Sequence, residues 1–147
     1  MDFYELDLND QVLDALDDMN FIDCTPIQEH AIPAILEGRD VIGVAQTGTG
    51  KTAAYLLPVL SRLCDNPGPE NKISCIIMSP TRELAQQIDQ SLAGFSYYVP
   101  ISSVAVYGGN DGIRYEQEKR GLLMGADIII ATPGRLCLLY TSDAADD

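Results

Sequence analysis

The chain has 147 residues, of which 22 are acidic, 9 are basic and 1 is histidine, so its formal net charge is −13. The length allows one domain, and 46% apolar residues with a mean hydropathy of +0.03 exclude a disordered or fibrous chain. No apolar run approaches the roughly 20 residues of a membrane-spanning helix. The acidic first 20 residues exclude a secretory signal and a mitochondrial transit peptide.

The first 40 residues predict two helices. Asn9 caps a helix over residues 10–19, whose apolar positions fall on one face and whose aspartates fall on the other. Thr25 caps a second helix, which ends near residue 37, and Gln28 completes a capping box with it. Taken alone, the capping role already explains Gln28.

From residue 41 onward, short apolar strands alternate with helices. We expect strands over 41–45, 73–78, 101–107 and 127–131, and helices over 51–63, 80–95 and 111–124. This β-α-β-α-β-α-β order predicts a parallel sheet covered by helices on both faces. In such sheets ligands bind beyond the carboxyl ends of the strands. The turns at those ends are 46–52, 79–83, 108–110 and 132–135, and all are rich in Gly, Thr, Pro or Arg.

Residues 45–52 match the phosphate-loop pattern, with Ala45 in place of its first glycine. Glycines let successive backbone N–H groups point at phosphate oxygens, and the following helix N-terminus favours an anion. Lys51 would bridge the outer phosphates, and Thr52 would offer its hydroxyl to Mg²⁺. A chance glycine-rich turn is the alternative, but the pattern stands between a predicted strand and a predicted helix, as a phosphate loop requires.

Two further turns resemble each other, at residues 79–83 and 132–135. Each follows a buried strand and carries a hydroxyl, a proline and an arginine. Either turn alone could be a capped helix start with a solvent-facing arginine. Two of them on one sheet edge indicate a surface that holds phosphates through helix N-termini and backbone N–H groups, which needs little net positive charge.

Five motifs occur in the order that is typical of DEAD-box RNA helicases: residues 21–28, 45–52, 80–84, 108–109 and 132–135. Over residues 1–136 the chain resembles the front part of the first RecA-like domain of that family. The resemblance implies a RecA-like α/β phosphate-loop fold with helices flanking a parallel sheet, ATP and Mg²⁺ as ligands, and RNA as the partner. Cys24 departs from the family, which usually has proline there.

The resemblance also assigns roles to single residues. Thr25 and Gln28 match the adenine-recognising Q motif. In that motif Phe21 is the stacking aromatic, and Phe3 is the isolated upstream aromatic. Without the resemblance, Phe21 would be interpreted as a core residue. The residues matching the triphosphate and Mg²⁺ loop are Thr47, Gly48, Thr49, Gly50, Lys51 and Thr52, with Lys51 and Thr52 as the catalytic pair. The residues matching RNA-backbone positions are Pro80, Thr81, Arg82, Gly108, Gly109, Thr132, Pro133, Gly134 and Arg135.

The Asp-Glu-Ala-Asp motif, the Ser-Ala-Thr motif and the second RecA-like domain of the family do not occur in the sequence. By the resemblance, the strands that flank the phosphate-loop strand also come later in the family's chain, so the sheet is expected to be incomplete. Since the chemistry needs a carboxylate for Mg²⁺ and arginine fingers from the second domain, we expect no ATP hydrolysis by these 147 residues alone.

Residues 137–147 resemble a transposon-type sequencing adapter read as protein, so we expect a non-native tail after residue 136. A natural terminus with a solvated acidic end is the alternative. We therefore predict a partial RecA-like domain over residues 1–136. Residues 1–38 form its Q-motif region, and residues 39–136 contain the phosphate loop and the expected RNA contacts. Charge follows this division, because residues 1–40 contain eleven acidic residues and one basic residue.

The function expected for the parent protein is ATP-dependent RNA unwinding, with RNA held by its backbone and no membrane association. The alternative is a nucleotide-binding module without helicase activity, and a DNA helicase of the same superfamily is a third possibility. Four cysteines without a Cys-x-x-Cys pair and a single histidine predict no structural zinc and favour a reducing cytoplasm.

Overall fold

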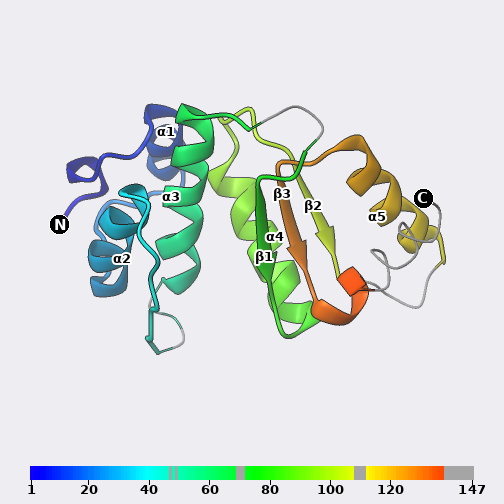
Figure 1. Ribbon diagram of the computed structural model, residues 1–147. Helices are drawn as coiled ribbons and strands as arrows, with labels where there is room; N and C mark the ends of the chain where they lie inside the picture. Colours follow the sequence, from blue (N-terminus) through cyan, green and yellow to red (C-terminus); the bar gives the residue numbers. More distant parts are fainter. Residues whose placement is uncertain (47, 49, 69–71, 108–111, 138–147) are drawn as a thin grey trace. The chain divides into compact units, whose positions relative to one another are not determined.

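This computed structural model describes residues 1–46, 48, 50–68, 72–107 and 112–137, which form two units (Figure 1). Three whole helices, a short 3₁₀ turn and the end of a fourth helix form the first unit. Unit 1 comprises Met1–Pro67 and Ser91–Pro100, and unit 2 comprises Gly68–Gln90 and Ile101–Asp147. None of the helices in the described parts is long and apolar enough to cross a membrane.

Unit 1 contains η1 (Phe3–Glu5), α1 (Asp10–Asp18), α2 (Pro26–Leu36) and α3 (Lys51–Asp65). The two predicted N-terminal helices are confirmed to within about a residue at each end. Asn9 caps α1 as expected, because its side chain accepts a hydrogen bond of 2.8 Å from the Gln11 amide. The Asn9 amide also donates to the Ser61 hydroxyl at 2.6 Å, which fixes the start of α1 against α3.

The core of unit 1 is built from the apolar faces of these helices. Val12 and Leu16 come from α1, Ile32 from α2, and Leu56 and Leu57 from α3, and each is at most 1% exposed. Fully burying an aliphatic side chain of this size contributes about 1.5–3 kcal/mol. Packing on this core, rather than helix propensity, therefore holds the helices at fixed positions.

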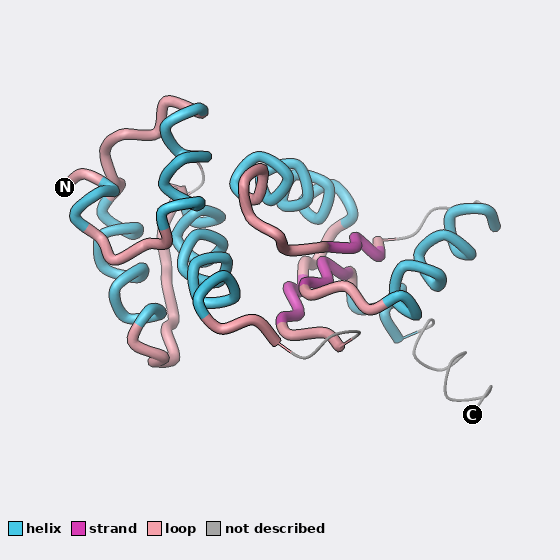
Figure 2. The backbone as a smooth tube through the Cα atoms, turned by 90° about the horizontal axis from the view of Figure 1, so that it is seen from above, coloured by secondary structure: helices cyan, strands magenta, loops and turns pink. Residues whose placement is uncertain are grey.

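The helices α2 and α3 run in the same direction. Their first turns are joined by a hydrogen bond between the Gln28 side chain and the Gly50 carbonyl, and their last turns line one cavity. Figure 2 shows the two helices side by side. Because helix dipoles point the same way in parallel helices, both positive ends lie at the same end of unit 1.

Residues 41–45 were expected to form a strand, and that prediction is wrong. They lie outside every strand of the described chain, and Ile42 and Val44 are 96% and 90% exposed. A strand depends on hydrogen bonds to a neighbouring strand, and no described residue pairs with this segment. Its apolar side chains therefore remain in solvent although their composition is typical of a buried strand.

Unit 2 contains a three-stranded parallel sheet in the order β1-β3-β2, formed by β1 (Cys75–Met78), β2 (Ser103–Val106) and β3 (Ile128–Ala131). The central strand β3 is buried along its whole length, as its unbroken apolar run predicts. Helices α4 (Arg82–Phe95) and α5 (Gly112–Met124) flank the sheet (Figure 1). The predicted parallel α/β fold is confirmed for these three strands, in an incomplete RecA-like form.

The register of the sheet brings the strand ends to one edge. Met78 pairs with Ala131, and Val106 pairs with the same residue from the other side. Beyond the last rung, the Ser79 amide donates to the Ala131 carbonyl at 2.8 Å and the Thr132 amide donates to the Val106 carbonyl at 3.2 Å. The turns that follow β1 and β3 consequently leave the sheet at the same level.

Helix α5 approaches β2 closely at Gly121. A Cβ atom at that position would lie 2.9 Å from the Cγ2 atom of Val104, closer than real Cβ atoms come to a neighbour. The adjacent Leu122 packs on a cluster formed by Val106, Ile129 and Ala131. A glycine, which weakens a helix by up to about 1 kcal/mol relative to alanine, is therefore retained here for contact with the sheet.

We predict that Gly121→Ala lowers the free energy of unfolding, although the same change raises it at an open helix position. The stiff Val104 side chain must move to admit the methyl group, and overpacking typically costs about 1–3 kcal/mol. Urea unfolding followed by circular dichroism measures the effect. In a Val104→Ala background, the same substitution is expected to be neutral or stabilising, and an equal loss in both backgrounds would contradict the packing argument.

Candidate functional site

Two loops carry the candidate site residues, and the first is the phosphate loop of unit 1. Gly48 and Gly50 have φ angles of +85° and +81°, a left-handed conformation that glycine adopts without strain. Gly50 is the N-cap of α3, so Lys51 is the first residue of the helix and Thr52 the second. Lys51 is exposed and Thr52 half-buried. Thr47 and Thr49 lie outside the described residues.

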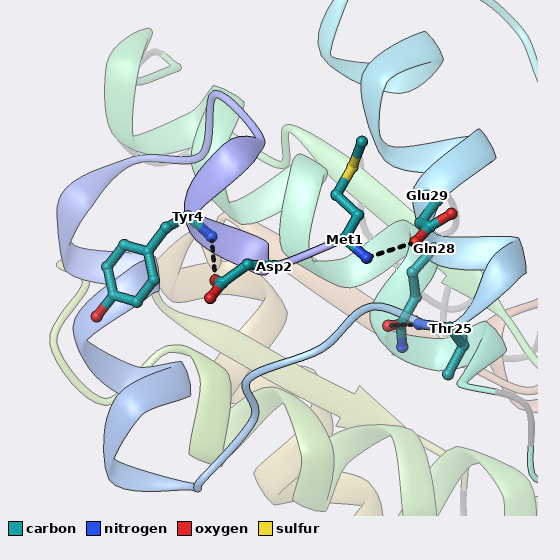
Figure 3. A network of polar contacts seen from close by, with 6 residues as sticks. All are labelled: Met1, Asp2, Tyr4, Thr25, Gln28 and Glu29. Atoms are coloured by element: carbon teal, nitrogen blue, oxygen red, sulfur yellow. Dashed lines mark hydrogen bonds and ion pairs between the residues drawn. The ribbon is translucent and has the colours of Figure 1, made fainter.

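The start of α2 packs directly on this loop. The Gln28 Oε1 atom accepts from the Thr25 amide at 2.9 Å (Figure 3), and its Nε2 atom donates to the Gly50 carbonyl at 3.1 Å. A Cβ atom at position 50 would lie only 2.3 Å from that Nε2 atom. Position 50 therefore requires glycine for two reasons, the left-handed backbone and the contact with Gln28.

Gln28 keeps hydrogen-bonding capacity in this arrangement. It is 4% exposed, and a side-chain amide offers two donor hydrogens and two acceptor lone pairs, of which these bonds use one each. Beside it, the Thr25 hydroxyl is buried in the capping box at the start of α2, where it faces the Gln28 backbone amide without a hydrogen bond of normal geometry. Gln28 and Thr25 thus place buried polar groups at this corner of unit 1, which suits a polar ligand.

The two aromatics that were assigned to the same site differ in exposure. Phe3 is 2% exposed and belongs to the core, whereas Phe21 is 37% exposed. The Phe21 ring lies 6.4 Å from the Phe3 ring in a stacked arrangement and 5.7 Å from Phe95, edge to face. Phe21 thus presents some ring surface to solvent, while Phe3 supports it from the core.

Cys24 is the position at which the sequence departs from the family pattern. It lies between Phe21 and Thr25 in the sequence, and its thiol is half-buried. Burial raises its pKa to about 11, and the nearby Glu29 carboxylate acts in the same direction. The thiol is therefore protonated at neutral pH and is a poor nucleophile.

A cavity of about 450 Å³ lies away from the phosphate loop. It lies at the C-terminal ends of α2 and α3 and is lined by Glu5, Asp7, Glu37 and Asp65 together with Arg62. Carboxylates and the negative ends of helix dipoles repel phosphate. These acidic side chains thus lie at the end of unit 1 that is far from the phosphate loop, where they repel a bound anion least.

The second candidate region is the sheet edge of unit 2. Pro80, Thr81 and Arg82 are all exposed there, and the Thr81 hydroxyl accepts from the Leu84 amide at 3.2 Å, which caps α4. The buried Ser79 donates its hydroxyl proton to the Thr81 carbonyl at 2.9 Å and so shapes the turn. This turn is a capped helix start with a solvent-facing arginine, and it also presents a helix N-terminus at the sheet edge.

The turn after β3 begins a second helical segment on the same edge. Thr132 is half-buried and Pro133 and Gly134 are exposed. Arg135 is not solvent-facing, because only 13% of its side chain is exposed and its Nε atom donates to Glu118 at 2.7 Å. Gly108 and Gly109 follow β2 but lie outside the described residues.

Sequence reasoning missed Glu118, which is 3% exposed in α5. A weak signal exists, since Glu118 precedes Gly121 and Leu122 by one helical turn and therefore shares the face that packs on the sheet. Among the described residues, no three His, Cys, Asp or Glu side chains are grouped so that they could hold a metal ion.

Comparison with known proteins identifies the family that this chain resembles. The model of the family named DEAD/DEAH box helicase matches residues 25–146. The ATP-dependent RNA helicase RhlB of Aliivibrio salmonicida is 43% identical over 148 residues, which cover 98% of this chain and 33% of the relative. The ATP-dependent RNA helicase DeaD of Escherichia coli K12 is 43% identical over 136 residues, covering 91% and 20%. The ATP-dependent rRNA helicase RRP3 of Eremothecium gossypii is 44% identical over 134 residues, covering 91% and 26%.

The chain spans between a fifth and a third of the length of these relatives. The similarity extends over nearly all of the chain and includes both candidate regions. On this ground the chain belongs to the DEAD/DEAH box helicase family.

Proposed function

We propose that the parent protein is an ATP-dependent RNA helicase and that this chain supplies its nucleotide-binding loop and part of its RNA-backbone surface. The observation that carries the proposal is the direct hydrogen bond between Gln28 and the Gly50 carbonyl of the phosphate loop. Relatives that cover this chain are named ATP-dependent RNA helicases, which supports the same activity. A nucleotide-binding module without helicase activity remains the second candidate for the isolated chain.

The base of the nucleotide would be held at the start of α2. The remaining donor and acceptor of Gln28 match the ring nitrogen and amino group of adenine. The buried Thr25 hydroxyl beside Gln28 is a second polar group for the ligand. Phe21 would stack on the base with its exposed ring face, and Phe3 would support Phe21 from the core.

The phosphates would be held at the start of α3. A helix N-terminus offers unpaired N–H groups and a partial positive charge, which favour an anion. Gly48 and Gly50 have the backbone conformation that a tight loop needs, and Lys51 is exposed to reach the outer phosphates. Thr47 and Thr49 are proposed for the same loop from the family pattern.

Mg²⁺ would receive one ligand from this chain, the Thr52 hydroxyl in the first turn of α3. Such an ion commonly keeps several waters and binds phosphate oxygens, so one hydroxyl from the loop fits its coordination. With the nucleotide bound, Mg²⁺ supplies charge neutralisation at the phosphates. Because the sequence contains no Asp-Glu-Ala-Asp motif, we propose that the 147 residues alone bind ATP without hydrolysing it.

The RNA backbone would lie on the sheet edge of unit 2. Arg82 is exposed there beside the N-terminus of α4, and the exposed Pro133 and Gly134 follow β3 at the same level. Phosphate contacts of this kind do not read base sequence, so the surface would accept many RNA sequences. Thr132, Arg135, Gly108 and Gly109 are proposed for this surface from the family pattern. We also propose a cytoplasmic location, from the cysteine pattern of the sequence.

We predict that Lys51→Ala weakens ATP binding by about tenfold to a hundredfold while the fold is retained. A hydrogen bond to a charged phosphate contributes about 1.5–3 kcal/mol, and an exposed lysine contributes little to packing. Isothermal titration of the 147-residue chain with ATP measures the loss, and circular dichroism checks the fold. Lys72→Ala removes another exposed lysine as the matched control, and equal affinities of the two variants would refute the phosphate-loop assignment.

We predict that Arg82→Ala weakens binding of a fluorescent single-stranded RNA to a similar degree for unrelated sequences. Each phosphate contact that is lost should reduce the slope of log affinity against log salt by about 0.7. Fluorescence anisotropy at several salt concentrations measures both quantities. Arg39→Ala serves as the control, because Arg39 is exposed and paired with Glu37 in unit 1. An unchanged affinity and slope in Arg82→Ala would leave the turn as a capped helix start only.

A further inference from the structure

The ion pair between Glu118 and Arg135 is the most deeply buried pair of charges among the described residues. The Arg135 Nε atom donates to Glu118 Oε2 at 2.7 Å, and the two side chains are 13% and 4% exposed. They come from different elements, α5 and the turn after β3. A carboxylate at this depth carries a large desolvation cost, which only a close and well-aligned cation offsets.

Packing alone gives no reason for a carboxylate at this position. One helical turn further along α5, Gly121 touches Val104 and Leu122 joins the apolar cluster on the sheet. An apolar side chain at position 118 would suit that face, and replacing a buried ion pair by apolar residues is often neutral or stabilising. The pair therefore points to a role for Arg135 that depends on its orientation.

We propose that Glu118 is a positioning residue that orients the Arg135 guanidinium at the RNA-backbone surface, and this inference rests on the proposed function of that surface. A guanidinium is planar and carries five donors in a fixed fork. Holding the Nε edge by a carboxylate fixes the plane of the whole group. With only 13% of the side chain exposed, the direction of the remaining donors depends on that plane.

The opposite role, in which Glu118 competes with RNA phosphate for Arg135, is disfavoured by burial. If RNA drew Arg135 away, it would leave a carboxylate that is 3% exposed without this cation. Breaking a buried pair by removing one partner typically costs more free energy than a single hydrogen bond to a phosphate returns. The pair is therefore expected to persist when RNA binds.

The two roles predict effects of opposite sign, so substitutions at position 118 distinguish them. We measure anisotropy of a fluorescent ten-nucleotide oligouridine with the 147-residue chain. Glu118→Gln keeps an oxygen that can accept from Arg135 Nε, and we expect RNA affinity within about threefold of the parent chain. Glu118→Asp keeps the charge, but its side chain is one methylene shorter, so the carboxylate lies farther from Arg135. We expect at least a threefold loss of RNA affinity in this variant. Tighter binding by either variant, or no loss in Glu118→Asp, would overturn the positioning role.

A double-mutant cycle tests whether Glu118 acts through Arg135. Glu118→Leu should weaken RNA binding about tenfold in the parent chain and cause no further loss in an Arg135→Ala background. Additive losses would overturn the inference, because Glu118 would then act elsewhere. Urea unfolding of each variant identifies a loss of fold, and Glu118→Asp decides the question if Glu118→Leu does not fold.

The same measurements separate this inference from the proposed function on which it rests. If Arg82→Ala and Arg135→Ala weaken RNA binding but Glu118→Asp and Glu118→Leu do not, only the positioning role fails. If the parent chain itself does not bind the oligouridine, the RNA-backbone surface fails, and the positioning role fails with it.

Discussion

The hydrogen bond from Gln28 to the Gly50 carbonyl is the contact on which the candidate nucleotide site depends. It joins the first turns of α2 and α3, which run in parallel, so both helix dipoles present their positive ends at the phosphate loop. Acidic residues line the cavity at the opposite ends of the same helices. A chain with a net charge of −13 can thus offer a local anion site, because charge distribution rather than net charge determines what binds at one loop.

In unit 2 the corresponding constraint is strand register. Met78 and Val106 both pair with Ala131, so the segments that follow β1 and β3 emerge at one edge of the sheet. That edge carries helix starts rather than a basic patch, and helix N-termini with backbone N–H groups bind phosphates without many cations. Of the two arginines assigned to this edge, Arg82 is exposed and Arg135 is held by Glu118. Under the proposed function, the exposed Arg82 would reach the RNA backbone from solvent, and Arg135 would contact it in a fixed orientation.

Features that depend on local chemistry could be predicted from the sequence. Asn9, Thr25 and the phosphate-loop glycines determine where three helices begin, and caps act within a few residues. The segment 41–45 could not be judged in this way, because a strand needs a neighbour that composition does not specify. The burial of Phe3 and the pairing of Glu118 with Arg135 are likewise tertiary. The motifs predicted candidate site residues, whereas packing decides which of them face solvent.

The central claim is that Gln28 links recognition of the base to the phosphate loop. The most direct test compares the affinities of the 147-residue chain for ATP and GTP, with and without Gln28→Ala, by isothermal titration. Guanine presents a carbonyl oxygen where adenine presents an amino group, so it mismatches the remaining donor and acceptor of Gln28. We predict that the parent chain prefers ATP by at least tenfold and that Gln28→Ala binds both nucleotides equally. Equal binding by the parent chain, or an unchanged preference in Gln28→Ala, would contradict the account.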